Sequence, residues 1–481
     1  MLPPLIRRAR KRAQLRSRER GFTMALVAGS LVAIIAMAAL SIDVGTLYQA
    51  KAEAQRSADA AALAAARVIS LSGITGDPTN ADGSWAMICG GASSPASLAA
   101  INVAQQNLIG GLPPSPPTVN YGAGSAGASN PDCSSGGPGF ANFGVNPVVT
   151  VTVQRANLPI FFARIFSLFG SNFSSTSVSA TASAEVYNPS QSSLLGSGMI
   201  PVQPRCVKPL IVANKDPGNG GQLVNADGTI GTPGINQLGS GVIGETFTIR
   251  ADCAPGATNC NAPDQAGGGN MLDNPPTSKT VSGTTFLDYI PAVVNGTPGA
   301  VPACSTASPF QQAVGGCDQT TLYACGQSLA TQADLTINPG GAAGDTSTAT
   351  QCLTHSVPTY GGADFLEGGA TPTFPFEIKA GDGNPLKNAG LVDANDIITS
   401  SSSVVTLPIG YFGTTGLPTG VNQPFVTVAG YLQVFVQSID TTNGNMVVTV
   451  LNVAGCGNTV PSGATYVTGT SPVPVRLIKS P

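Results

Sequence analysis

The sequence predicts an α+β protein held in a membrane by one amino-terminal helix. Three features predict this: an uncharged stretch at residues 21–42, an alanine-rich helical repeat after it, and a carboxy-terminal half of short apolar runs between turn residues. We expect a basic tail (1–20), a transmembrane helix (21–42) that continues into a long amphipathic helix within a small α+β region (43–187), and a disulfide-containing, loop-rich antiparallel β domain (188–481).

The uncharged stretch has the length of a membrane span. Its 22 residues would form a helix about 33 Å long, and the hydrocarbon core of a bilayer is about 30 Å thick. Eight basic residues precede it, Arg7, Arg8, Arg10, Lys11, Arg12, Arg16, Arg18 and Arg20. Because basic flanks stay in the cytoplasm, we expect the remainder to be exported. That remainder has 14 basic and 24 acidic residues, which argues against nucleic-acid binding.

The apolar stretch has two interpretations. Ala36-Met37-Ala38 resembles a signal-cleavage site. The run is longer than a usual signal core and the helical pattern continues beyond it, which favours a retained anchor. Ala25, Gly29 and Ala33 are spaced by four, a small-residue pattern that lets membrane helices associate closely. These residues are candidates for homo-oligomerisation through the anchor.

From Leu47 to Ile69 the sequence predicts an amphipathic helix. Small apolar residues recur at steps of three or four, at Ala50, Ala54, Ala58, Ala61 and Ala65. Alanine has the highest helix propensity, and this spacing places the residues on one face. The narrow face suits close packing on another helix or a sheet, either within the exported domain or in an assembly. Asp43, at the membrane exit, is expected to face headgroups and water, and the alternative is a contact with a partner anchor.

These residues resemble the amino-terminal signature of TadE/TadG-like proteins of the tight-adherence (Tad) system, which assembles Flp pili. The matching positions are Gly21, Phe22, Asp43, Gly45, Tyr48, Gln55, Ala58, Asp59, Ala60, Ala61 and Leu63. The resemblance implies a non-enzymatic structural or accessory component of pilus assembly, in the bacterial inner membrane with a cytoplasmic amino terminus and a periplasmic or extracellular bulk. It implies other Tad pilus-assembly proteins or pilin-like subunits as partners.

Gly21-Phe22-Thr23 resembles the site that prepilin peptidases cut. Such substrates usually carry Glu at the fifth position after the cut, where this chain has Leu26. The difference favours an uncleaved accessory protein over a processed filament subunit. The alternative function is an exported cell-surface adhesin or binding module whose signal segment is removed. Size on a gel and membrane fractionation separate the two.

Several shorter elements follow the long helix. We expect a helix at 95–109, a loop at 111–146, strands at 148–153 and 178–186, and a short apolar helix at 160–169 between the strands. The apolar face of the first of these helices is expected to contain Leu98, Ile101, Ala104 and Leu108.

Residues 188–481 predict β structure. Two apolar runs, 425–436 and 446–453, flank Asn443-Gly444, a strong hairpin signal. All ten cysteines follow the membrane segment, so in an oxidising compartment we expect up to about five disulfides. Their connectivity stays open, and short loops favour two local bridges, Cys253 with Cys260 and Cys317 with Cys325.

Catalytic signals are weak. The chain has one histidine, His355, and no G-x-S-x-G, H-E-x-x-H or phosphate-binding motif. We therefore expect no enzyme, no cofactor and no metal. Segment 345–349 is interpreted as a linker. Two segments, 216–228 and 382–396, mix Asp, Asn and Gly in ways that could ligate calcium through oxygen. Neither matches an EF-hand loop, and ordinary turns are the favoured interpretation.

Overall fold

The computed structural model describes most of the chain, and its residues form two compact units. The described residues are 4–77, 80, 82–124, 128–135, 143–144, 146–158, 176–186, 202–204, 206–225, 228–251, 279–281, 284–294, 308–318, 320–321, 323–326, 328–330, 342–357, 361–411, 425–441, 444–456, 465–467, 473 and 475–478. The first unit contains residues 1–61, 101–118 and 152–181, and the second contains 62–100, 119–151 and 182–481.

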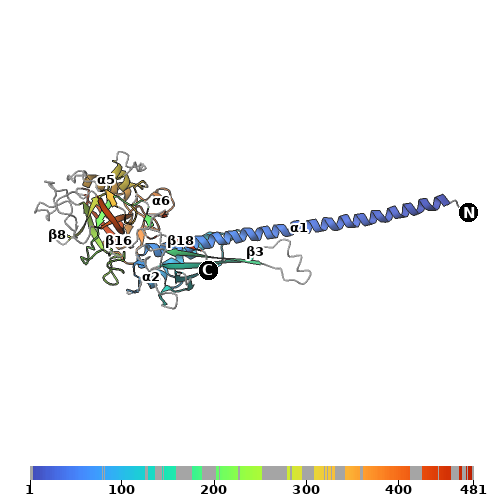
Figure 1. Cartoon of the computed structure of the whole chain (residues 1–481), viewed down its shortest axis with the longest axis horizontal. Helices are drawn as coiled ribbons and strands as arrows, with labels where there is room; N and C mark the ends of the chain where they lie inside the picture. Colours follow the sequence, from blue (N-terminus) through green and yellow to red (C-terminus); the bar gives the residue numbers. More distant parts are fainter. Residues whose placement is uncertain are drawn as a thin grey trace. The chain divides into compact units, whose positions relative to one another are not determined.

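Helix α1 runs without interruption from Pro4 to Leu71 (Figure 1). The predicted membrane span and the predicted amphipathic helix are therefore one element. Its described part from Thr23 is long and apolar enough to cross a membrane. The helix ends just before Gly73, which has a φ of 77° and so provides the left-handed conformation common after helix ends.

A five-stranded sheet has the order β18-β4-β3-β1-β2. Its strands are β1 (Thr118–Ala123), β2 (Ala128–Asn130), β3 (Pro147–Leu158), β4 (Thr176–Val186) and β18 (Val475–Ile478). The expected strands at 148–153 and 178–186 are confirmed as parts of β3 and β4. The loop expected at 111–146 is wrong in part, because it contains β1 and β2. Alternate burial of Val119 and Tyr121 stabilises β1 despite its Gly- and Pro-rich flanks.

The last strand of the chain, β18, pairs antiparallel with β4, with Val475 opposite Val186. The carboxy terminus therefore returns to the sheet built by the region before residue 188. The boundary at 187/188 stays a prediction, but the two regions share this sheet. The short apolar helix expected at 160–169 lies outside the described residues.

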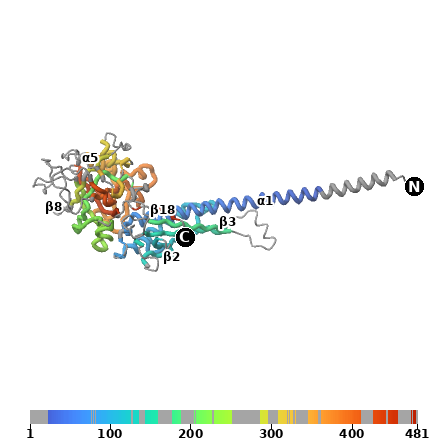
Figure 2. Tube along the Cα trace, in the orientation of Figure 1, coloured from blue at the N-terminus to red at the C-terminus, as the bar shows by residue number. Residues whose placement is uncertain are grey.

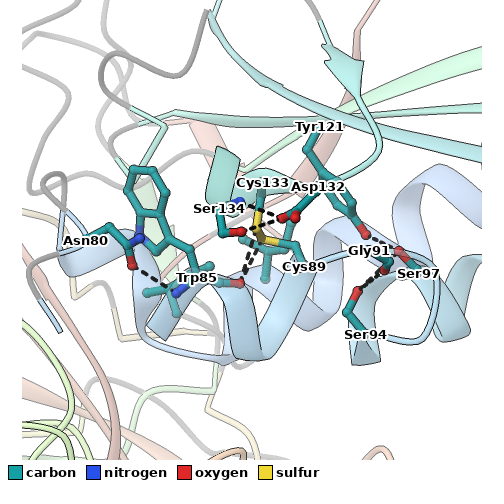
Figure 3. The surroundings of a disulfide bond; sticks show 12 residues. Asn80, Trp85, Cys89, Gly91, Ser94, Ser97, Tyr121, Asp132, Cys133 and Ser134 are labelled. Atoms are coloured by element: carbon teal, nitrogen blue, oxygen red, sulfur yellow. Dashed lines mark hydrogen bonds between the residues drawn. A yellow bond between two sulfur atoms is a disulfide. The ribbon is translucent and has the colours of Figure 1, made fainter. Parts of the chain in front are cut away.

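Short helices and a disulfide surround Trp85 in the second unit (Figure 3). They are η1 (Ile74–Gly76), α2 (Ser84–Cys89) and η3 (Cys133–Ser135). The Cys89–Cys133 disulfide joins α2 to η3. The main-chain N–H of Trp85 donates to the side-chain oxygen of Asn80 at 3.1 Å, and its ring meets Phe143 edge-on with centroids 4.8 Å apart. These contacts bury the chain's one tryptophan.

The larger sheet has eight strands. They are β6 (Leu210–Ala213), β7 (Thr246–Ala251), β8 (Lys279–Val281), β9 (Thr284–Pro291), β10 (Ser328–Ala330), β14 (Val404–Tyr411), β15 (Phe425–Ile439) and β16 (Met446–Gly455). The predicted hairpin is confirmed as the antiparallel pair β15–β16. The sheet is mixed rather than purely antiparallel, because β6 pairs parallel with β14 and β7 parallel with β9.

Six of these strands form a closed ring. The neighbours run β15-β14-β6-β9-β7-β16, and β16 pairs back with β15. Strands from distant parts of the sequence, such as β7 and β16, consequently lie side by side (Figure 2). Closure satisfies main-chain groups that an open sheet would expose along its edges. We conclude that the second unit is built around a small mixed β-barrel.

The second unit also contains helices and short strands that are not part of the barrel. They are α4 (Pro309–Gly315), α5 (Ala342–Leu353), α6 (Pro385–Asn388), the sheet of β11 (Phe365–Leu366), β12 (Ile378–Lys379) and β13 (Ile397–Ile398), and the parallel pair β5 (Val202–Pro204) with β17 (Thr465–Val467). The linker expected at 345–349 is wrong, because it lies inside α5. Asp345 accepts a hydrogen bond from Gln311 at 2.7 Å, and Thr346 shares one with Tyr289 at 2.8 Å. These contacts outweigh the weak helix propensity of Thr and Ser.

The disulfides correct one predicted pairing. Cys317 bonds to Cys206, 111 residues away, and Cys325 bonds to Cys456, 131 residues away. The local bridge between Cys317 and Cys325 is therefore wrong, because folding brings distant segments to each of them. Cys352 is also disulfide-bonded. Cys253 and Cys260, the other predicted pair, lie outside the described residues.

Candidate functional site: the amino-terminal helix

Helix α1 has two successive surfaces. In its apolar span the large side chains are not covered by other residues. Met24, Val32 and Met37 are 78, 66 and 64 % exposed. Further along, one face is buried. Each of its members is at most 3 % exposed: Ala50, Ala54, Ala58, Ala61, Ala62, Ala65, Ala66 and Ile69. The predicted alanine face is confirmed as a packing surface, and we call these eight residues the alanine face.

Helix α3 (Pro95–Gln106) has a small-residue face of its own. Ala96, Ala100 and Ala104 are fully buried, whereas Leu98 and Leu108 are 45 and 50 % exposed. The expected face with those two leucines is therefore wrong, since the face that packs contains alanine. Within the first unit the hydroxyl of Ser57 donates to the main-chain oxygen of Ala104 at 3.2 Å. Such a bond requires the two helix backbones to lie close together, which small side chains permit.

Polar side chains beside the alanine face attach α1 to the rest of the first unit. Glu53 accepts a hydrogen bond from the main-chain N–H of Gly110 at 2.7 Å, and this bond holds the pKa of Glu53 below its usual value. Gln55 donates to the main-chain oxygen of Thr181 in β4 at 3.4 Å and to Asp59 at 2.8 Å. Lys51 donates to the main-chain oxygen of Ser179. Gln55, a signature residue, therefore helps to position the helix, and the signature residue Asp59 orients the side chain of Gln55.

The other signature residues differ in how far their side chains are buried. Tyr48 is 74 % exposed, and nothing lies within 4 Å of where a Cβ at Gly45 would stand. Asp43 was expected to face headgroups and water, but its side chain is 3 % exposed between the exposed Ile42 and Val44. Among the remaining signature residues, Ala58 and Ala61 are fully buried, Ala60 and Leu63 are half-buried, and Gly21 and Phe22 lie within α1.

The three candidates for helix association lie on the open part of α1. Ala25, Gly29 and Ala33 are exposed, and no atom lies within 4 Å of a Cβ placed on Gly29. Nothing in the described chain occupies this face.

The single histidine lies in a structural setting that the sequence did not indicate. The Nδ1 atom of His355 is 3.2 Å from the hydroxyl of Ser402, and burial lowers the pKa of His355 while nearby Asp364 partly offsets this effect. Asp364 in turn accepts hydrogen bonds from Gly381, Asn384 and Ser401. These bonds hold three loops together. In the described part of the chain, no three His, Cys, Asp or Glu side chains are grouped together.

Comparison with known proteins gives one match, and it falls on α1. Residues 21–68 match the family described as "Putative Flp pilus-assembly TadE/G-like". No curated protein and no solved structure matches the chain. The matched segment begins at the apolar span and ends within the alanine face. The amino-terminal region of this chain, residues 21–68, is therefore similar to the TadE/G-like Flp pilus-assembly family.

Proposed function

We propose that the protein is a membrane-anchored structural or accessory component of Flp pilus assembly and that it catalyses no reaction. The observation that supports this most is the continuity of α1. An exposed apolar span of membrane length and a buried alanine face follow one another in a single helix, inside the segment that matches the family. A helix of this kind positions a domain at a membrane surface.

The proposed topology places the basic tail in the cytoplasm, the span in the bacterial inner membrane and the remainder in the periplasm. Basic residues concentrated in front of the span favour this orientation. The disulfides Cys89–Cys133, Cys206–Cys317 and Cys325–Cys456 also favour it, because such bonds persist in oxidising compartments. Other Tad pilus-assembly proteins or pilin-like subunits are the proposed partners.

The test uses the full chain with different tags at its two ends. Both tags should migrate together at full length in the inner-membrane fraction. A membrane-impermeant thiol probe applied after mild reduction should reach the cysteines from the periplasm. Loss of the amino-terminal tag with a soluble remainder would instead support the alternative, an exported adhesin or binding module. Labelling only from the cytosol would refute the topology.

We also propose that the anchor self-associates through Ala25, Gly29 and Ala33. Ala33→Leu should reduce chemical cross-linking between copies in membranes at least about fivefold, because bulk on this face separates the helices. Ala28→Leu is the matched control, because position 28 lies about 100° around the helix from Gly29 and so off the proposed face. Equal cross-linking of the two variants would rule out this face.

A further inference from the structure

Asp216 lies at the start of a loop that follows β6, inside the second unit, and it is fully buried. Its Oδ1 atom accepts hydrogen bonds from the main-chain N–H groups of Gly218 at 2.9 Å and Asn219 at 3.4 Å. Its Oδ2 atom accepts one from the hydroxyl of Thr232 at 2.9 Å. The carboxylate is therefore held in one orientation by its own loop and by a second loop.

Glu245 is the residue before β7, and its carboxylate lies next to that of Asp216. Its main chain is bonded on both sides, with its N–H donating to Val242 and its oxygen accepting from Val450 at 2.9 Å. The side chain is 8 % exposed and lies against the Asp216 loop. A Cβ placed on Gly218 would overlap both carboxylate oxygens of Glu245. The absence of a side chain at Gly218 is what lets the second carboxylate approach the first.

The two carboxylates lack a compensating cation in the described part of the chain. None of its ion pairs includes Asp216 or Glu245. Oε1 of Glu245 receives a long hydrogen bond of 3.3 Å from Asn236, and its buried Oε2 atom has no hydrogen-bond partner. Burial, and next the neighbouring Asp216, raise the pKa of Glu245 to about 8. An unpartnered oxygen this deeply buried is costly unless a proton or a cation binds there.

We propose that Asp216 and Glu245 form a calcium site in the barrel unit. The carboxylates of Asp216 and Glu245 offer oxygen donors, which calcium prefers. The hydroxyl of Thr232 also lies beside the pair, 2.9 Å from Oδ2 of Asp216. Two carboxylates suit an affinity on the order of 0.1–1 mM, as in extracellular modules.

Calcium binding at this pair should depend on pH. Because calcium needs both carboxylates ionised, its binding should release a proton and should be tighter at pH 8.5 than at pH 6.

The experiment uses the full chain in detergent, treated with EGTA and then titrated with CaCl₂ while its thermal unfolding is followed. We expect calcium at about 5 mM to raise the Tm by about 2 °C or more. Glu245→Gln should abolish the rise while keeping a Tm in EGTA at least equal to that of the wild type, because one repelling charge is gone. Gly218→Ala should weaken calcium binding at least about tenfold, since its Cβ displaces Glu245.

The matched control is Asp393→Asn, which changes an exposed carboxylate in the other Asp- and Asn-rich segment. It should keep the full calcium response. The proposal would be overturned if calcium left the wild-type Tm unchanged. It would also be overturned if Glu245→Gln kept the calcium-induced rise in Tm. An equal response to magnesium would overturn the assignment to calcium.

Discussion

The hydroxyl of Ser57 in α1 donates to the main-chain oxygen of Ala104 in α3 at 3.2 Å. A side chain as short as serine reaches a neighbouring helix backbone only where the two helices nearly touch. The buried alanines at this contact, Ala54 and Ala58 on α1 and Ala104 on α3, leave space for this approach. The alanine face thus gains its stability from close backbone packing rather than from large apolar side chains.

Ala58→Leu should therefore destabilise the protein. We expect a loss of about 1–3 kcal/mol in the free energy of unfolding, because the added atoms force the helices apart. Urea unfolding followed by circular dichroism measures it. Ala52→Leu adds the same atoms to an exposed position of α1 and should change stability by less than about 0.5 kcal/mol. Equal effects would show that the alanine face does not pack as described.

The disulfide between Cys325 and Cys456 should contribute strongly to stability. It closes a loop between residues 131 apart, and its sulfurs pack against a buried cluster that includes Tyr323 and Tyr431. Replacing both cysteines with serine should cost about 2–5 kcal/mol, as measured by urea unfolding without reductant. Peptide mapping under non-reducing conditions is the direct check, and a fragment that joins Cys317 to Cys325 would contradict the connectivity.

Lys208 should make stability depend on pH. Its side chain is 5 % exposed, and burial lowers its pKa from 10.5 to about 7. Between those values the unfolded chain binds the extra proton, so the free energy of unfolding should rise with pH by about 1 kcal/mol per pH unit. Lys208→Met should reduce this slope, measured by urea unfolding from pH 7 to about 9.5.

The control for this measurement is Lys387→Met, which removes a lysine from a partly exposed ion pair with Asp382. It should change the free energy of unfolding by less than about 1 kcal/mol. An unchanged slope in Lys208→Met would contradict a neutral buried amine at Lys208.

Tyr48 should matter for assembly and not for folding. It is 74 % exposed within the matched segment, where no packing requirement accounts for an aromatic ring. Tyr48→Ala should alter the free energy of unfolding by less than about 0.5 kcal/mol and should reduce the number of surface pili severalfold. Leu98→Ala removes another exposed apolar side chain outside that segment and should leave pili unchanged. Normal piliation in Tyr48→Ala would exclude Tyr48 as a contact.

Features set by neighbouring residues could be read from the sequence. The apolar span, the alanine period and the Asn-Gly hairpin depend on side chains a few positions apart, and α1, the alanine face and the β15–β16 pair are all present. The signature of the pilus-assembly family lies in the same local pattern. Helix α5 was missed because its Thr and Ser residues carry little helical signal and tertiary bonds hold it.

Features that join distant segments required the tertiary structure. The partner of Cys317 is 111 residues away, the barrel closes only when β16 meets both β7 and β15, and nothing near Asp216 in the sequence points to Glu245 as its neighbour. Short-loop entropy indicated the wrong partner for Cys317, because burial around the barrel outweighs the slowly growing cost of closing a longer loop. The local sequence determined α1 and the β15–β16 hairpin, whereas long-range packing held α5 in place and decided which residues meet.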